Sequence, residues 1–163
     1  MTAQKEVRTV LEILRKFFRF CDERERSEFY RSIVLGVLAA LFSALKIPAI
    51  GLSVKVYEGT GSATLAKGAG HFSNTSLWDG NCCIAAHNRG TNNYFGKIHT
   101  LESGDTITWT TKLGTRTYEV VSVEKVLETD TSGTAATPDN RLTLYTCVRD
   151  QREYRWMVQA VEK

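Results

Sequence analysis

The chain has little of several features that mark specialised classes of protein. Its 163 residues contain four cysteines and no Cys-x-x-Cys pair, which argues against a zinc site and against a dense disulfide framework. Its net charge of +3 is small, its basic residues are scattered, and it has no nucleic-acid-binding motif, so we expect no nucleic-acid partner. It also lacks internal repeats. What remains is a chain long enough for one domain with a sizeable core and an extension.

A long apolar run is missing too. The main uncharged apolar segment, Ile33 to Leu45, has 13 residues, whereas a helix needs about 20 to cross a bilayer. Before it, apolar residues recur at helical spacing between charged ones, at Val7, Leu11, Leu14, Phe18 and Cys21. We therefore predict that residues 1–45 form N-terminal helices, separate from a second domain at residues 46–163.

Residues 1–45 leave several interpretations open. The helices could pack on the second domain, pair with a second copy of the chain, or lie on a membrane. The amphipathic pattern of Val7 to Cys21 favours packing or self-association, with membrane contact as the alternative. A cleaved signal peptide is disfavoured, because a long charged helix precedes the apolar segment and no A-x-A-like site follows it.

Residues 46–163 are rich in predicted strands. Ile47 to Val56 is predicted as a pair of strands, and Thr106–Thr111 with Arg116–Leu127 as a hairpin. Glu128 to Arg141 is predicted as a loop of small polar residues, and Val148 to Tyr154 as the loop between two C-terminal strands. Short strands at regular intervals, separated by turn residues, indicate a mainly β fold, a closed β-barrel.

Three residues at predicted strand ends suggest a nucleophilic site. Leu142 to Cys147 is a predicted buried strand that ends in the cysteine, His87 follows the apolar run Cys82–Ala86, and Arg155 opens the last strand. A thiol nucleophile, an imidazole that transfers protons and a guanidinium that stabilises an anion are the groups that acyl transfer needs. Only a few per cent of a free thiol is ionised at neutral pH, and neighbouring cations favour the reactive thiolate.

Neighbouring residues compete for these roles. His71, in the loop before the Cys82–Ala86 run, is the reserve histidine and a candidate for lining the site, whereas His99 is predicted to lie in a surface turn. Arg152 is the second choice after Arg155. Thr146, beside the cysteine, is a candidate for positioning the substrate.

The pattern Thr143-Leu144-Tyr145-Thr146-Cys147, with Ala86-His87 before it and Arg155 after it, resembles the sortase family, the cysteine transpeptidases of Gram-positive bacterial surfaces. The resemblance covers roughly residues 46–163 and includes Ile47-Pro48-Ala49-Ile50-Gly51-Leu52, which is similar to the opening strand of the family. The compact spacing and the tract Gly68-Ala69-Gly70-His71-Phe72 are most similar to class D or class B sortases. The resemblance implies a sortase-like closed β-barrel of about eight strands, with N-terminal helices.

The resemblance also implies an activity and partners. Cys147 would cleave an LPxTG-like sorting signal through a thioester acyl-enzyme, with His87 transferring protons and Arg155 stabilising the oxyanion. The partners would be surface proteins that carry the sorting signal and an amine acceptor of peptidoglycan or pilin, at the extracellular face of the cytoplasmic membrane. No cofactor and no metal are implied.

Two other functions remain open. One is a cysteine hydrolase or an L,D-transpeptidase-like enzyme acting on peptidoglycan peptides, although the sequence lacks a Ser-His-Gly-Cys-type signature. The other is a non-catalytic β-barrel binding module. A cysteine buried far from His87 would favour the module.

Overall fold

The computed structural model of this chain describes Ser27 and residues 43–163. The helices predicted from Val7 onward lie outside the described residues. The elements are β1 (Ser43–Ile47), η1 (Pro48–Ile50), β2 (Leu52–Glu58), α3 (Ser62–Leu65), β3 (Ala69–His71), β4 (Asn81–Ala85), η2 (Ile98–Thr100), β5 (Thr106–Thr111), β6 (Gly114–Leu127), η3 (Ser132–Thr134), β7 (Arg141–Val148) and β8 (Gln151–Glu162).

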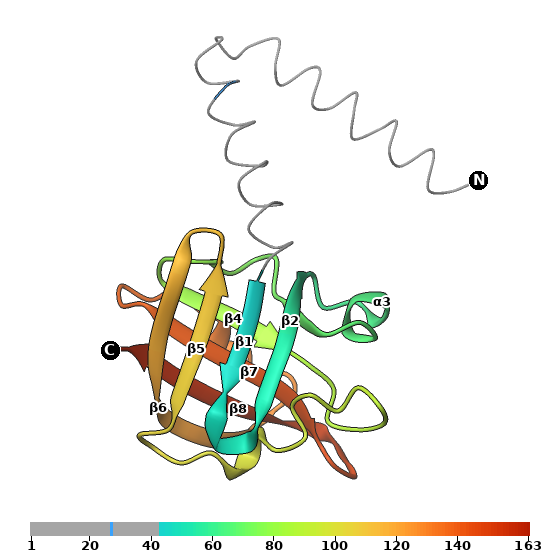
Figure 1. Cartoon of the computed structure of the whole chain (residues 1–163). Coiled ribbons are helices and arrows are strands. Elements are labelled where there is room, and N and C mark those ends of the chain that lie inside the picture. The colour runs from blue at the N-terminus through green and yellow to red at the C-terminus, as the bar shows by residue number, and fades with distance from the viewer. Residues whose placement is uncertain (1–26, 28–42) are drawn as a thin grey trace, which may run out of the picture. The chain divides into compact units, whose positions relative to one another are not determined.

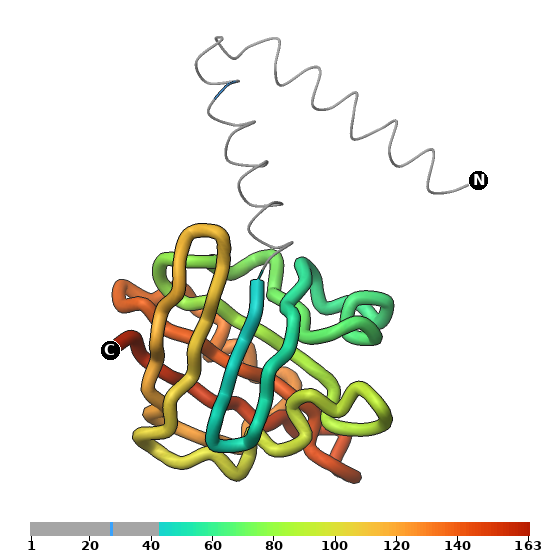
Figure 2. The backbone as a smooth tube through the Cα atoms, in the orientation of Figure 1, coloured from blue at the N-terminus to red at the C-terminus, as the bar shows by residue number. Residues whose placement is uncertain are grey.

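The strands close into a barrel in the order β1-β2-β3-β4-β7-β8-β6-β5 (Figure 1). Six of the eight neighbouring pairs are antiparallel, and β2/β3 and β4/β7 are parallel. The tube in Figure 2 shows the long β5–β6 hairpin and the β7–β8 hairpin that extends beyond the barrel. The closed eight-stranded, mainly β fold predicted from the sequence is therefore confirmed.

The interior of the barrel is filled by alternate residues of the strands, as the two-residue period of a strand requires. In β5 the burial alternates regularly, so that Ile107, Trp109 and Thr111 are buried. Trp109 is fully buried, and its indole Nε1–H donates to the carbonyl of Leu77 at 3.1 Å. A buried indole needs such an acceptor, and this bond attaches the loop before β4 to the barrel wall.

Strands β4 and β7 are buried on both faces. Leu142 and Leu144 of β7 face the barrel core, while the outer face is covered by the loop at residues 128–140. Asn81 fixes this loop, because its side-chain amide donates to the carbonyls of Gly133 at 2.8 Å and Ala135 at 2.9 Å. A side chain at position 133 would overlap Tyr145 and Met157, so glycine lets the loop lie against β7.

Several local predictions were wrong. The Val148–Tyr154 loop does not exist: β7 and β8 are joined by a two-residue turn, Arg149-Asp150, with Asp150 at a φ of 60°. The residues after the turn were predicted as a loop because they are polar, and they are polar because this end of the hairpin is exposed. The short parallel strand β3 was missed. Strand β1 begins at Ser43, so Ser43 to Leu45, predicted as the end of the helical segment, belong to the barrel.

Candidate active site

Cys147 is an exposed residue within an otherwise buried stretch of β7. The five residues from Leu142 to Thr146 are buried, whereas Cys147 is exposed. It is the exposed one of the three cysteines in the described residues; Cys82 and Cys83 are both buried in β4. Burial raises the pKa of the Cys83 thiol to about 11 and also raises the pKa of the Cys82 thiol. Among the described cysteines, Cys147 is therefore the one suited to reaction in water.

Arg155 lies opposite Cys147 on the neighbouring strand. The two residues are register partners in the antiparallel pair β7/β8. Side chains of directly opposite residues stand on the same face, with Cβ atoms about 4.5–5.5 Å apart. The predicted pairing of these two residues at one place on the barrel is therefore what the structure has.

The guanidinium of Arg155 is held by several acceptors. Its Nη1 donates to the carbonyls of Arg152 at 2.7 Å and Tyr154 at 2.8 Å, and its Nη2 to the carboxylate of Glu128 at 2.6 Å. These bonds fix the side chain of Arg155 at the edge of the site. A donor fixed before the reaction stabilises developing charge without reorganisation.

His87 lies on the other side of Cys147. Strand β4 runs parallel to β7 up to Ala85, which lies opposite Tyr145, and His87 follows Ala85 by two residues, on the side of β7 away from β8. One backbone bond continues the pairing beyond the strand, from Ala86 N–H to the Tyr145 carbonyl at 3.3 Å. Two side chains add to it: Thr146 Oγ1 donates to the Ala86 carbonyl at 2.7 Å, and the side-chain amide of Asn88 donates to the Cys147 carbonyl. His87 itself is exposed.

Two cavities meet at Cys147. The first has a volume of about 640 Å³ and a mixed lining. Its apolar and aromatic residues are Ile50, Leu52, Tyr94, Val148 and Trp156, and its polar and basic residues are Asn88, Asn93, Lys97, His99, Thr146 and Arg149. The second, of about 630 Å³, is strongly charged and is lined by Arg89, Glu128, Cys147, Val148, Asp150, Arg152 and Arg155. The cysteine is thus reached from two sides whose chemistry differs.

The secondary candidates from the sequence lie in different places. Thr146 is buried and lines the first cavity, but its hydroxyl is bonded to the Ala86 carbonyl. Arg152 is exposed and lines the second cavity. Neither His71 nor His87 lines either cavity, although the residues after His87 do: Asn88 lines the first and Arg89 the second.

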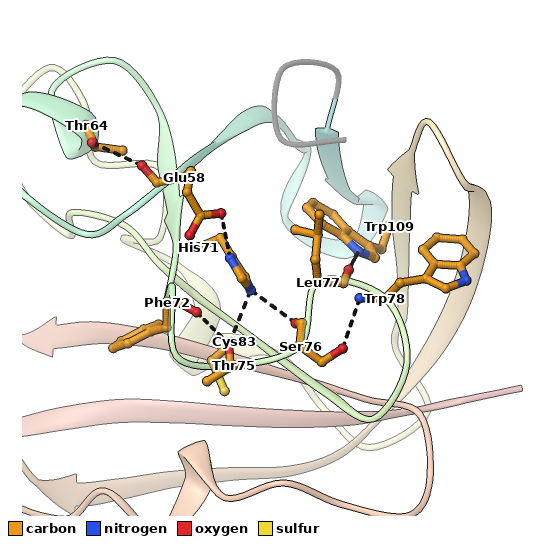
Figure 3. Close-up of polar contacts among 10 residues, drawn as sticks. All are labelled: Glu58, Thr64, His71, Phe72, Thr75, Ser76, Leu77, Trp78, Cys83 and Trp109. Carbon is orange, nitrogen blue, oxygen red and sulfur yellow. Dashed lines mark hydrogen bonds and ion pairs between the residues drawn. The ribbon is translucent and has the colours of Figure 1, made fainter. Parts of the chain in front are cut away.

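His71 is a buried residue of β3 whose two ring nitrogens both have partners (Figure 3). Its Nδ1 lies 2.9 Å from a carboxylate oxygen of Glu58, and its Nε2 lies 3.1 Å from the Ser76 carbonyl and 3.2 Å from Thr75 Oγ1. These contacts hold the loop after β3 against the barrel. A buried polar ring that is bonded in this way stabilises local structure.

Sequence reasoning missed two contributors to the site. His99 lies in the exposed turn η2, as predicted, but its stacking was not foreseen: its ring lies on Trp156 with ring centroids 5.5 Å apart, and both residues line the first cavity. Glu128, the ion-pair partner of Arg155, was treated only as the first residue of a loop. The position of Trp156 directly after Arg155 indicated an aromatic ring near the site, against which His99 packs. Nothing in the sequence pairs Glu128 with Arg155.

No group of three or more His, Cys, Asp or Glu side chains comes together within residues 43–163 in a way that would hold a metal ion. None of the helices in the described part of the chain has the length and apolar character needed to cross a membrane.

Known proteins resemble this chain across the barrel. A family model described as the sortase domain matches residues 45–163. Sortase A of Listeria monocytogenes is 31% identical over 110 residues, which are 66% of this chain and 50% of that protein, so the chain spans about half the length of this relative.

Solved structures agree with the sequence match. Sortase C-1 from Actinomyces oris is 27% identical with a TM-score of 0.71, covering 74% of this chain and 73% of that one. Sortase A from Corynebacterium diphtheriae is 29% identical with a TM-score of 0.70, covering 74% of this chain and 60% of that one. Because the family model covers well over half of the residues, this chain belongs to the sortase family.

Proposed function

We propose that this protein is a cysteine transpeptidase that cleaves a sorting signal and joins the new C-terminus to an amine. One observation carries the proposal: Cys147 is exposed at the end of β7, with His87 following β4 on one side and Arg155 on β8 on the other. A nucleophile between a proton-transfer group and a cationic donor is an arrangement suited to acyl transfer.

In the first half-reaction the Cys147 thiolate attacks the carbonyl carbon of the scissile peptide bond. The C–N bond then breaks, and the leaving amine takes a proton from His87, which leaves a thioester on Cys147. In the second half-reaction an amine attacks the thioester and gives a proton to His87, and the C–S bond breaks to restore the thiolate. Arg155 stabilises the oxyanion in both halves, a contribution that is worth about 10²–10³-fold in rate for one donor.

The two cavities support a reaction with two substrates. A transpeptidase must bind an acyl donor and an amine acceptor at the same sulfur atom. The first cavity, of about 640 Å³ with a mixed lining, and the second, charged cavity, of about 630 Å³, both include Cys147, so each substrate could have its own approach. Thr146 and Arg152 are proposed to contact or position these substrates, since each lines one cavity.

Membership of the sortase family supports the choice of substrates. We propose an LPxTG-like sorting signal on surface proteins as the acyl donor, and an amine of a peptidoglycan precursor or a pilin lysine as the acceptor. The corresponding location is the cell surface of a Gram-positive bacterium. The relatives named above are sortases of classes A and C, and the assignment to class D or class B stays a prediction.

Mass spectrometry of the intact protein, mixed with a panel of LPxTG-type peptides, tests the proposal. We expect an adduct with the mass of the peptide's acyl fragment, which disappears when an amine such as triglycine is added. The Cys147→Ala variant is the matched control, because it keeps the buried pair Cys82 and Cys83. An adduct that persists in this variant would contradict the proposal.

The same experiment separates the other functions. Peptide cleavage that depends on Cys147 but gives only the hydrolysed product in the presence of amines would indicate a hydrolase. Alkylation of Cys147 that changes neither cleavage nor peptide binding would indicate a non-catalytic binding module. The exposure of Cys147 beside the end of β4 argues against the module.

A further inference from the structure

Glu128 occupies a particular place at the edge of the charged cavity. It directly follows β6, and its backbone N–H donates to the Glu153 carbonyl of β8 at 2.8 Å, which continues the β6/β8 pairing by one more residue. Its side chain accepts from Arg155 Nη2 at 2.6 Å. Glu128, Arg155 and Cys147 line the same cavity.

The contacts of Arg155 divide into local ones and one distant one. Nη1 donates to the carbonyls of Arg152 and Tyr154, which belong to the same strand as Arg155. Among the described residues, Glu128 supplies the contact that reaches Arg155 from outside β8, 27 residues away in the sequence. The two local bonds attach Nη1 of Arg155 to β8, and the carboxylate of Glu128 fixes the direction of Nη2.

Two of the N–H donors of Arg155 remain available for a substrate. A guanidinium has five N–H groups. Three of them are used by Arg152, Tyr154 and Glu128, so one Nη2–H and Nε–H remain. Because the group is planar and rigid, fixing three donors also fixes the direction of the remaining two.

We propose that Glu128 is a positioning residue for Arg155: it holds the guanidinium so that its two remaining donors are directed to the oxyanion that forms at Cys147. The proposal rests on the function proposed above. Glu128 acts through Arg155 and does not itself contact the reacting atoms. Because Glu128 is also the first residue of the loop at 128–140, one residue links the anchoring of that loop to the orientation of the arginine.

The exposure of the Arg155–Glu128 ion pair distinguishes a role in catalysis from a role in stabilising the fold. The side chain of Arg155 is 28% exposed and that of Glu128 is 49% exposed. An ion pair that is this open to water contributes little to stability. A misplaced catalytic group, by contrast, can lower a rate by about 10²-fold for a shift of about 1 Å. Loss of Glu128 is therefore expected to change the rate far more than it changes the folding equilibrium.

A double-mutant cycle in the full chain tests the proposal. The variants are Glu128→Ala, Arg155→Ala and the double variant, with kcat/KM measured for transfer of an LPxTG-type peptide to triglycine. We expect Glu128→Ala to lower kcat/KM by between about 10-fold and about 10²-fold. Adding Glu128→Ala to Arg155→Ala should lower it no further, because the carboxylate then has no arginine to hold.

Two more variants sharpen the cycle. Glu128→Gln keeps a side-chain oxygen that accepts from Nη2, so it should retain most of the activity that Glu128→Ala loses. Glu124→Ala is the matched control, an exposed glutamate on β6 that has no ion-pair partner among the described residues. It should behave like wild type, and thermal unfolding should be similar for all variants. An equal and additive loss in both backgrounds, or unchanged kcat/KM in Glu128→Ala, would overturn the proposal.

A second measurement does not depend on activity. The order parameter of the Arg155 side-chain Nε–H, measured by NMR, should fall in Glu128→Ala and stay near the wild-type value in Glu124→Ala. An unchanged order parameter would reject the positioning role even if the protein is an active transpeptidase. If wild type forms no acyl-enzyme but the order parameter falls, the proposed function fails and the proposed restraint on Arg155 stands.

Discussion

The two sides of Cys147 are built in different ways. On the β8 side, the guanidinium of Arg155 is bonded to two carbonyls and a carboxylate. On the β4 side, the bonds hold the backbone around His87, and its imidazole is exposed with no side-chain hydrogen bond within the described residues. A group that stabilises charge benefits from a fixed position, whereas a group that gives a proton to one substrate and takes one from another has to serve two geometries.

Replacing His87 should have the largest effect among the changes to these two sides. We expect His87→Ala to lower kcat/KM for peptide transfer by about 10²–10⁴-fold, because general acid–base catalysis is lost. Since the imidazole has no partner to displace within the described residues, free imidazole should restore part of the activity. The measurement is kcat/KM against imidazole concentration, with Arg155→Lys as the control that imidazole does not rescue. Full activity in His87→Ala would show that another group transfers the proton.

The variant Arg155→Lys tests the β8 side, because it keeps the positive charge and removes the planar guanidinium. Lysine carries the same charge but cannot make the planar set of bonds to Glu128, Arg152 and Tyr154. We expect Arg155→Lys to lower kcat by about 10²-fold, with a smaller change in KM, because the donor acts on the developing oxyanion. A variant with wild-type kcat would mean that charge alone is sufficient and that the fixed geometry has no role.

The smallest effect is expected for a bond on the β4 side, between β7 and the residue before His87. Thr146→Val keeps the shape of the side chain but leaves the Ala86 carbonyl without its buried donor, at a cost of about 1–3 kcal/mol in the free energy of unfolding. Because Ala86 precedes His87, kcat/KM should also fall. Urea unfolding measures the stability, and Thr91→Val, at an exposed threonine, is the control that should change it by less than about 0.5 kcal/mol. Equal unfolding curves for the two variants would contradict this role for Thr146.

Much of the barrel could be predicted because its strands follow simple rules. β5 could be predicted from the alternation that one buried face imposes, and β7 from the continuous run that burial on both faces produces. The two-residue period of a strand also predicts that Cys82 and Cys83 point to opposite faces. In the structure Cys82 lies in the core cluster and the Cys83 thiol contacts the Gly133 carbonyl of the covering loop.

Other parts could not be predicted because they depend on contacts between distant residues. β3 has three residues and pairs in parallel with β2, so its sequence carries almost no periodicity. The polar start of β8 has the composition of a loop, although its register with β6 and β7 makes it a strand. The stacking of His99 on Trp156 and the pairing of Glu128 with Arg155 arise only after the barrel has closed.

The two-residue turn between β7 and β8 has a consequence for the order in which the site assembles during folding. Cys147 and Arg155 are eight residues apart on one hairpin, so a single local folding event of the microsecond class brings them together. His87 lies 60 residues before Cys147 and reaches it only through the parallel β4/β7 pairing, which requires a long chain loop to close first. We therefore expect a folding chain to bring the nucleophile and its anion donor together early, and to become able to transfer protons only when the barrel is complete.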